Sequence, residues 1–359
     1  MTFLTILAAL VMLGIMIMVH EFGHFISARM TGIAVQQFSI GFGPKLFGWK
    51  SKKHDTEFMV RLIIPIGGYC MFYGEDDAQG KHVDDPRSYY KQSVWKRMFS
   101  VIMGPAMNLV LAFVVAVGLF FIGGIQTVVP YVATVESNSP AAQAGLEPGD
   151  IFLSINGQNV QDGTTDKVAS LIRAFKEGDE PLAVQVLRGQ DNTQVTLSVT
   201  PFYDASNQRF RLGIEIGGIP GQAMKRISFG EAVSRGYATC VDAGKLILNG
   251  LKNLIFKGEG LEESAGPVGI VQQISVQTQQ YGLQGYLYLL IILSINLGLV
   301  NLLPIPGLDG SRLLFMLVEA IFRKPVNRKA EAMIHLAGFA VLISAMLFLT
   351  YRDIQRLIQ

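Results

Sequence analysis

Two histidines and a glutamate stand at metal-binding spacing near the start of the chain. Residues 19–25 read VHEFGHF, so His20 and His24 are four positions apart and Glu21 directly follows the first. Residues four apart on a helix project from one face, about one turn apart. Two imidazoles so placed can bind one Zn²⁺ while the intervening carboxylate acts on a bound water. The pattern predicts a zinc centre with Glu21 as its general base.

The surroundings of this motif strengthen the metal hypothesis. The segment before it, MTFLTILAALVMLGIMIMV, carries no charged side chain. A five-residue motif can arise by chance in a soluble protein. A membrane helix, however, has little use for three ionisable residues, and those kept inside spans are functional by default.

A catalytic zinc ion needs a third protein ligand and an open position for water. The sequence offers Asp309, His335 and, less suitably, Glu319. Asp309 lies in NLLPIPGLDG, where Pro304 and Pro306 must break a helix and can turn the carboxylate sideways toward the histidines. A lone histidine on an apolar helix is more often a packing residue, although the depth of His335 does not exclude it.

The composition favours a multispanning membrane protein. Of the 359 residues, 50% are hydrophobic and only 16% are charged, against about 25% charged in soluble domains. Four apolar segments approach the ~20 residues that cross a bilayer core: 2–25, 98–122, 286–303 and 332–350. The loops 25–97 and 311–331 carry 11 and 5 Lys and Arg residues, which predicts that both are cytoplasmic. The motif then lies near the cytoplasmic end of the first span.

Two further segments carry recognisable patterns. Residues 38–72 are rich in glycine and aromatics and alternate at Phe58, Val60, Leu62 and Ile64, which predicts short strands in or against the membrane. The run GPAMN at 104–108 indicates a kink in the second span, and Asn108 is expected to form a hydrogen bond that joins two helices.

Residues 126–217 read as a soluble α+β domain. Ser139 and Pro140 are expected to start a short helix, 164–178 a second helix ended by Gly178, and 182–200 a hairpin. The run SPAAQAGLEPGDIFLSINGQNV resembles a PDZ domain of the bacterial type. PDZ domains bind extended peptides at a sheet edge, although a passive spacer is the alternative. Residues 218–285 predict an amphipathic helical extension on the membrane surface, against the spans or against this domain.

Four features in order resemble the site-2 protease family of intramembrane zinc metalloproteases, closest to the bacterial regulator-of-sigma-factor type. They are the HExxH motif in the first span, GFGP, the PDZ insert and NLLPIPGLDG. FSIGFGPKLF resembles the family's re-entrant β-loop. The resemblance implies zinc ligands His20, His24 and Asp309, general base Glu21, and substrate-binding residues Asn296 and Asn301. Two departures are Ser311, where the family usually has glycine, and a length that leaves room for one PDZ domain.

The resemblance implies hydrolysis of peptide bonds in or near the transmembrane segment of single-span substrates, such as anti-sigma factors or signal-peptide remnants, in regulated intramembrane proteolysis. The expected location is the bacterial inner membrane, with the PDZ domain extracytoplasmic and binding peptide ends or extracytoplasmic segments. Membrane lipid is an expected partner and nucleic acid is not. An edge strand from 38–72 is hypothesised to capture the unwound substrate. A zinc-binding scaffold and a metal transporter remain as rivals.

The predicted organisation follows from these patterns. Cys70 and Cys240 fall on opposite sides of the membrane in this topology and are interpreted as incidental. The predicted segments are 1–27 (first span), 28–97 (cytoplasmic-side β-rich segment), 98–125 (second span), 126–217 (PDZ domain), 218–285 (helical extension), 286–310 (third span), 311–331 (cytoplasmic loop), 332–351 (fourth span) and 352–359 (tail).

Overall fold

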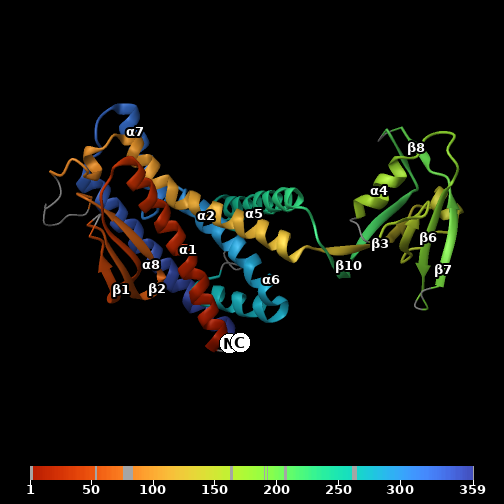
Figure 1. Ribbon diagram of the computed structural model, residues 1–359, viewed down its shortest axis with the longest axis horizontal. Coiled ribbons are helices and arrows are strands. Elements are labelled where there is room, and N and C mark those ends of the chain that lie inside the picture. The colour runs from red at the N-terminus through yellow and green to blue at the C-terminus, as the bar shows by residue number, and fades with distance from the viewer. Residues whose placement is uncertain are drawn as a thin grey trace. The chain divides into compact units, whose positions relative to one another are not determined.

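The structure, a computed structural model, describes residues 3–52, 55–75, 84–161, 165–189, 191, 193–205, 208–260 and 265–358. It divides into two compact units. The helical unit comprises Met1–Leu119 and Phe229–Gln359, and the inserted unit comprises Phe120–Ser228. Figure 1 shows long helices dominating the first and strands dominating the second. The inserted unit therefore interrupts the helical unit in sequence.

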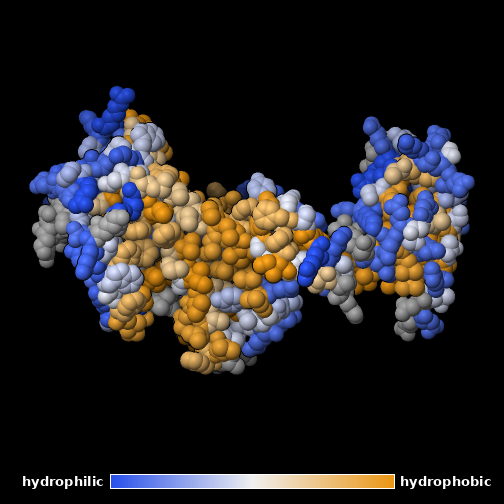
Figure 2. Space-filling view, in the orientation of Figure 1, coloured by the Kyte–Doolittle hydropathy of each residue, from blue (hydrophilic) through white to orange (hydrophobic). Residues whose placement is uncertain are grey.

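Four helices of the described residues have the length and apolar composition of membrane spans. They are α1 (Phe3–Thr31), α2 (Val94–Gly123), α6 (Pro267–Asn301) and α8 (Arg328–Ile358). At about 1.5 Å per residue even the 29 residues of α1 exceed the ~30 Å of a bilayer core. Figure 2 shows hydrophobic residues over much of the visible face of this unit. The four predicted spans are confirmed as helices of spanning length.

The third predicted span, 286–310, is not one helix. α6 begins at Pro267, well before residue 286. Within it Gly282 adopts φ 59° and ψ −141° and joins two helical stretches end to end. α6 ends at Asn301, as expected ahead of Pro304, whose ring lacks the N–H that a continuing helix needs.

The loop predicted at 311–331 is wrong in its first half, which forms α7 (Asp309–Phe322). The charges of this segment suggested a loop, but its apolar residues recur at helical spacing. Met316 is 4% exposed and packs in a cluster with Ala28 of α1 and Val101 of α2. This packing holds α7 against the cytoplasmic ends predicted for both spans.

A long β-hairpin follows α1. β1 (Val35–Lys50) and β2 (Glu57–Phe72) pair antiparallel, with several register shifts along the ladder. Phe25 of α1 lies 5.7 Å from Phe38 and 5.5 Å from Phe58, measured between ring centroids. The predicted strands joined by turns are confirmed: residues 37–40 of β1 pair with both 57–60 and 68–71 of β2, so β2 doubles back, and aromatic packing fixes the strands to α1. The short helix η1 (Tyr89–Lys91) then leads into α2.

The inserted unit is built on a sheet with strand order β10-β3-β4-β6-β7, and β5 pairs with β4. Its own hydrophobic core includes Val132, Phe152 and Val184, each 0% exposed. Its elements are β3 (Ile125–Val135), α3 (Pro140–Gln143), β4 (Ile151–Ile155), β5 (Gln158–Asn159), α4 (Thr165–Arg173), β6 (Leu182–Arg188), β7 (Thr193–Val199), β8 (Phe202–Asp204), β9 (Arg209–Arg211) and β10 (Ile214–Lys225).

Local predictions for this unit hold with one correction. Ser139 caps α3 by accepting from the backbone N–H of Ala142, and β6 and β7 form the expected hairpin. The second helix ends at Arg173 rather than before Gly178, because the Asp179 carboxylate accepts from the N–H of Lys176 and stabilises a turn there.

The helical extension predicted at 218–285 begins as strand rather than helix. β10 continues to Lys225 because its residues pair with β3 as far as Ile125. α5 (Phe229–Lys257) then packs Cys240 and Ala243 against α2 and α6. Of the predicted placements for this helix, packing against the spans is the one observed.

Removing the guanidinium of Arg188 is expected to destabilise the inserted unit. Arg188 Nε and Nη2 lie 2.8 and 2.7 Å from the two carboxylate oxygens of Asp150, which is 1% exposed. A buried carboxylate stripped of its partner costs about 3 kcal/mol. Urea unfolding of residues 125–225 carrying Arg188→Leu should show a free energy of unfolding lower by about 2–3 kcal/mol. Arg173→Leu, at an exposed position of α4, is the control, and an equal loss in both would contradict this role.

Candidate metal centre

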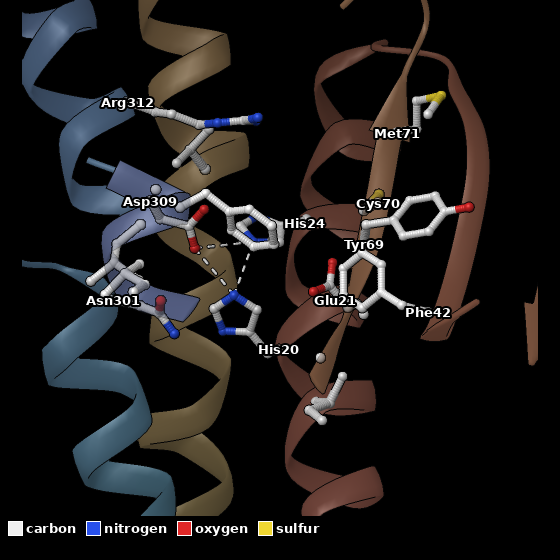
Figure 3. Close-up of a pocket in the computed structure, with 18 of the residues that line it drawn as sticks. His20, Glu21, His24, Phe42, Tyr69, Cys70, Met71, Asn301, Asp309 and Arg312 are labelled. Carbon is white, nitrogen blue, oxygen red and sulfur yellow. Dashed lines mark hydrogen bonds and ion pairs between the residues drawn. The ribbon is translucent and has the colours of Figure 1, made fainter. Parts of the chain in front are cut away.

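Asp309 completes a triangle of ligand atoms with the two predicted histidines. His20 and His24 lie on the buried face of α1, and Asp309 is the first residue of α7, directly after the turn that follows α6. The two Nε2 atoms are 3.2 Å apart, and Asp309 Oδ2 lies 3.1 Å from that of His20 and 3.3 Å from that of His24 (Figure 3). Groups from two distant parts of the chain therefore meet at one point.

The triangle has the dimensions of a metal site. A tetrahedral zinc ion with bonds of about 2.0–2.1 Å separates its ligand atoms by about 3.3 Å. Asp309 Oδ2 is buried and has no hydrogen-bond partner of good geometry within the described residues. Such an atom is costly unless a cation binds it. The three side chains therefore fit one face of a tetrahedral site and leave a fourth position open.

The backbone of α2 fixes the ring of His24. His24 Nδ1 donates to the carbonyl oxygen of Ser100 at 2.9 Å. With its proton on Nδ1, the ring directs the Nε2 lone pair at Asp309 and His20, as a metal ligand requires. Asn108, which the sequence indicated only as helix glue, places its carboxamide nitrogen 3.2 Å from Nδ1 of His20.

The two alternative third ligands have other roles. His335 Nδ1 lies 3.3 Å from the backbone nitrogen of Gly307 and 3.4 Å from Oγ of Ser311, so it contacts the turn that carries Asp309. Glu319 pairs with Arg97. Within the described residues, the group of side chains that could hold a metal ion consists of His20, His24 and Asp309.

The ligand atoms face a cavity of about 660 Å³. Its lining includes Glu21 and the last residues of β2, 67–72. In Figure 3, Asp309 and Asn301 lie on one side, and Glu21 with Tyr69 on the other. A Cβ atom at Gly68 would come within 3.0 Å of Glu21 Cγ and 2.6 Å of the Ser39 carbonyl oxygen. Glycine therefore lets β2 run directly against the predicted general base.

Comparisons with known proteins agree with this arrangement. The profile of peptidase family M50 matches residues 8–345. This chain belongs to peptidase family M50. It is 32% identical to the regulator of sigma-W protease RasP of Bacillus subtilis, with 98% of this chain and 99% of the relative covered. The zinc metalloprotease RasP of Bacillus licheniformis is 30% identical over the same shares. The site-2 protease resemblance is confirmed, and the chain is an intramembrane zinc metalloprotease acting in regulated intramembrane proteolysis.

The comparison with solved structures gives partial matches. The PDZ domain of the SdrC-like protein from Listeria monocytogenes is 25% identical and covers 26% of this chain and 88% of that structure, with a TM-score of 0.21.

Of the two asparagines predicted to bind substrate, one lines the cavity of this M50 peptidase and the other does not. Asn301, at the end of α6, lines the cavity. Asn296 is exposed on α6 and lies outside the lining formed by the described residues. The sequence patterns did not single out Arg312, which follows Asp309 by about one turn of α7. Arg312 lines the cavity and forms an ion pair with Glu75, which also lines it. Its position in the DGSR run, three residues after the ligand, was the available signal.

Adding one methyl group at Gly68 should impair this peptidase without removing its metal. The new Cβ would collide with the Ser39 carbonyl and displace Glu21. A shift of about 1 Å at a reacting group can cost up to about 100-fold in rate, so we expect cleavage by Gly68→Ala to fall about 10- to 100-fold with zinc content unchanged.

The matched control is Gly118→Ala in α2, where a Cβ would meet nothing within 4 Å. Wild-type cleavage by both variants would show that β2 does not approach the general base this closely.

Proposed function

We propose that His20, His24 and Asp309 hold one Zn²⁺ and that this peptidase cleaves single-span membrane proteins within or beside their span. The observation that carries the proposal is that the ligand triangle, Glu21 and the end of β2 share one cavity of a unit built from apolar helices. The relative in B. subtilis is named for regulating sigma-W, which supports anti-sigma factors as one substrate class. Signal-peptide remnants, which would be cleaved by the same hydrolysis, are a second substrate class.

The residues of the cavity have distinct roles in hydrolysis. When bound, zinc would act as a Lewis acid and acidify a water molecule. Glu21 takes the proton of the attacking water as the bond to the carbonyl carbon forms. It then gives that proton to the amine that leaves. Ser100 keeps His24 in the ligand tautomer throughout, because its carbonyl holds the Nδ1 proton.

A helical substrate must unwind before attack, because its own hydrogen bonds occupy its carbonyl groups. We infer that the unwound segment adds as a strand along residues 67–72 of β2, which line the cavity beside Glu21. Asn301 faces the same cavity and can hold the substrate backbone. Asn296 would need a substrate that extends beyond the cavity to take the role that the family resemblance gives it.

Proline at Met71 should block this strand addition, because proline removes a backbone N–H and does not fit a paired strand. We expect cleavage to fall at least about tenfold with zinc retained. Proline at Leu62, 58% exposed and outside the cavity lining, is the matched control. Unchanged cleavage by Met71→Pro would rule out capture on this strand.

The inserted unit is proposed to select substrates as a PDZ domain by binding peptide ends or extracytoplasmic segments. β10 is the outermost strand of the sheet among the described residues, and one side of it is therefore available for strand addition. Deleting residues 128–215 should then change which substrates are cleaved. Identical substrate selection after deletion would leave the unit as a spacer.

The basic loops support a topology with the metal centre near the cytoplasmic side of the bacterial inner membrane and the inserted unit outside. In this topology the peptidase meets its substrates in the lipid bilayer. Cysteine labelling of single engineered positions in intact cells, one in the inserted unit and one in residues 323–328, would test both sides.

A scaffold that binds zinc without catalysis and a metal transporter are the rivals, and one substitution separates all three. In Glu21→Gln the ligand triangle is intact, so zinc should be retained, while loss of the general base should lower cleavage at least about 100-fold. The assay incubates purified protein with a single-span substrate and measures bound zinc in parallel. Equal cleavage by the variant and the wild type would overturn the proposed mechanism.

A further inference from the structure

The GPAMN segment of α2, residues 104–108, lies against both histidine ligands. A Cβ atom at Gly104 would lie 2.2 Å from Nε2 of His24. Four residues later, Asn108 places its carboxamide nitrogen 3.2 Å from Nδ1 of His20. The four-residue spacing of Gly104 and Asn108 thus matches, in reverse order, the four-residue spacing of the histidines. Helices that run antiparallel past each other produce this pairing at successive turns.

We propose that GPAMN forms the second wall of the metal centre. Asn108 is a positioning residue that orients the His20 ring, and Gly104 provides the space that the His24 ring occupies. The inference deepens the proposed zinc function and rests on it. It replaces the sequence interpretation of this segment as a kink with a helix-joining asparagine.

The hydrogen bonding of Asn108 carries the first half of the inference. The side chain is 0% exposed, and in the orientation with nitrogen toward His20 its Oδ1 has no hydrogen-bond partner within the described residues. A buried amide oxygen left unpaired costs about 1–3 kcal/mol. The two ends of a carboxamide have nearly the same shape, and the hydrogen bonds decide its orientation.

A half-turn of this carboxamide pairs its oxygen with His20. Oδ1 then accepts the proton on Nδ1 of His20, and the Nε2 lone pair points at His24 and Asp309. In the opposite orientation Nδ1 accepts from the amide, Nε2 carries the proton, and His20 cannot bind a metal through the atom that faces the other ligands. Metal binding through Nε2 of His20 therefore requires the orientation with Oδ1 toward Nδ1.

The second half of the inference rests on the space that Gly104 leaves for the His24 ring. His24 also donates to the carbonyl of Ser100, one turn before Gly104 on α2, so its ring cannot move away from a side chain at 104 without losing that hydrogen bond. Gly118, on the same helix, has nothing within 4 Å of its Cβ position. A glycine is thus required at 104 by the ligand and not by the helix.

The test measures zinc affinity of the purified full-length protein by competition with a chelator. Asn108→Leu removes the acceptor, and we expect zinc affinity to fall about 10- to 100-fold. Asn108→Asp keeps an oxygen that can accept from Nδ1, and zinc affinity should stay within a few-fold of wild type. Thermal unfolding of the zinc-free proteins reports the separate contribution of Asn108 to helix packing.

Two outcomes would overturn the role of Asn108. One is wild-type zinc affinity in Asn108→Leu, with or without loss of zinc-free stability, which would leave Asn108 as helix glue only. The other is an equal loss in Asn108→Asp and Asn108→Leu, which would show that the acceptor oxygen is not what matters. Both outcomes are measured as zinc affinity, which does not depend on cleavage. A failure of the proposed hydrolysis, seen as normal cleavage by Glu21→Gln, is therefore distinguished from a failure of the role of Asn108.

The Gly104 half is tested by Gly104→Ala against Gly118→Ala. We expect the first to weaken zinc binding at least about tenfold and the second to leave it unchanged. Equal zinc affinity in both variants would show that His24 does not need the space at 104.

Discussion

Three ligand atoms must lie within 3.1–3.3 Å of one another inside a unit of apolar helices, and most of the site follows from this constraint. His20 is 8% exposed and His24 is 7% exposed, and a buried polar atom that binds neither a metal nor water needs a protein partner. His24 finds the Ser100 carbonyl, and Asn108 stands beside His20. The buried polar side chain of Asn108 in α2 is therefore explained by the histidine that it faces.

The carboxylate is placed by backbone packing rather than by a helix face. The turn after α6 passes so close to α8 that a Cβ atom at Gly338 would lie 2.1 Å from the Pro306 carbonyl oxygen. Gly307 adopts φ 97°, which glycine tolerates at no steric cost. His335 then contacts Gly307 and Ser311 on either side of Asp309. The serine that departs from the family pattern thus makes one of the contacts that hold the ligand in place.

What the sequence could predict depended on how local each feature is. The histidine pair follows from helical periodicity alone, whereas the residues favoured Asp309 as third ligand without excluding His335, and the family resemblance then chose it. The proximity of Asn108 and Gly68 to the site could not be predicted, because the contacts of α2 and β2 with α1 depend on helix and strand register. α7 was missed because its burial comes from packing on distant helices, which outweighs the charges it carries.

The inserted unit places a limit on how substrate selection can work. Its core closes on itself, and its entry and exit strands pair at Ile125 and Lys225, so the chain leaves α2 and returns toward α5 at one place. None of the groups that hold His24 and Asp309 belongs to this unit: Ser100, Gly307, Ser311 and His335 are all in the helical unit. If the insert selects substrates as proposed, the contacts of the described residues point to an effect on which polypeptide reaches β2 and Glu21, since His24 and Asp309 are held by groups of the helical unit.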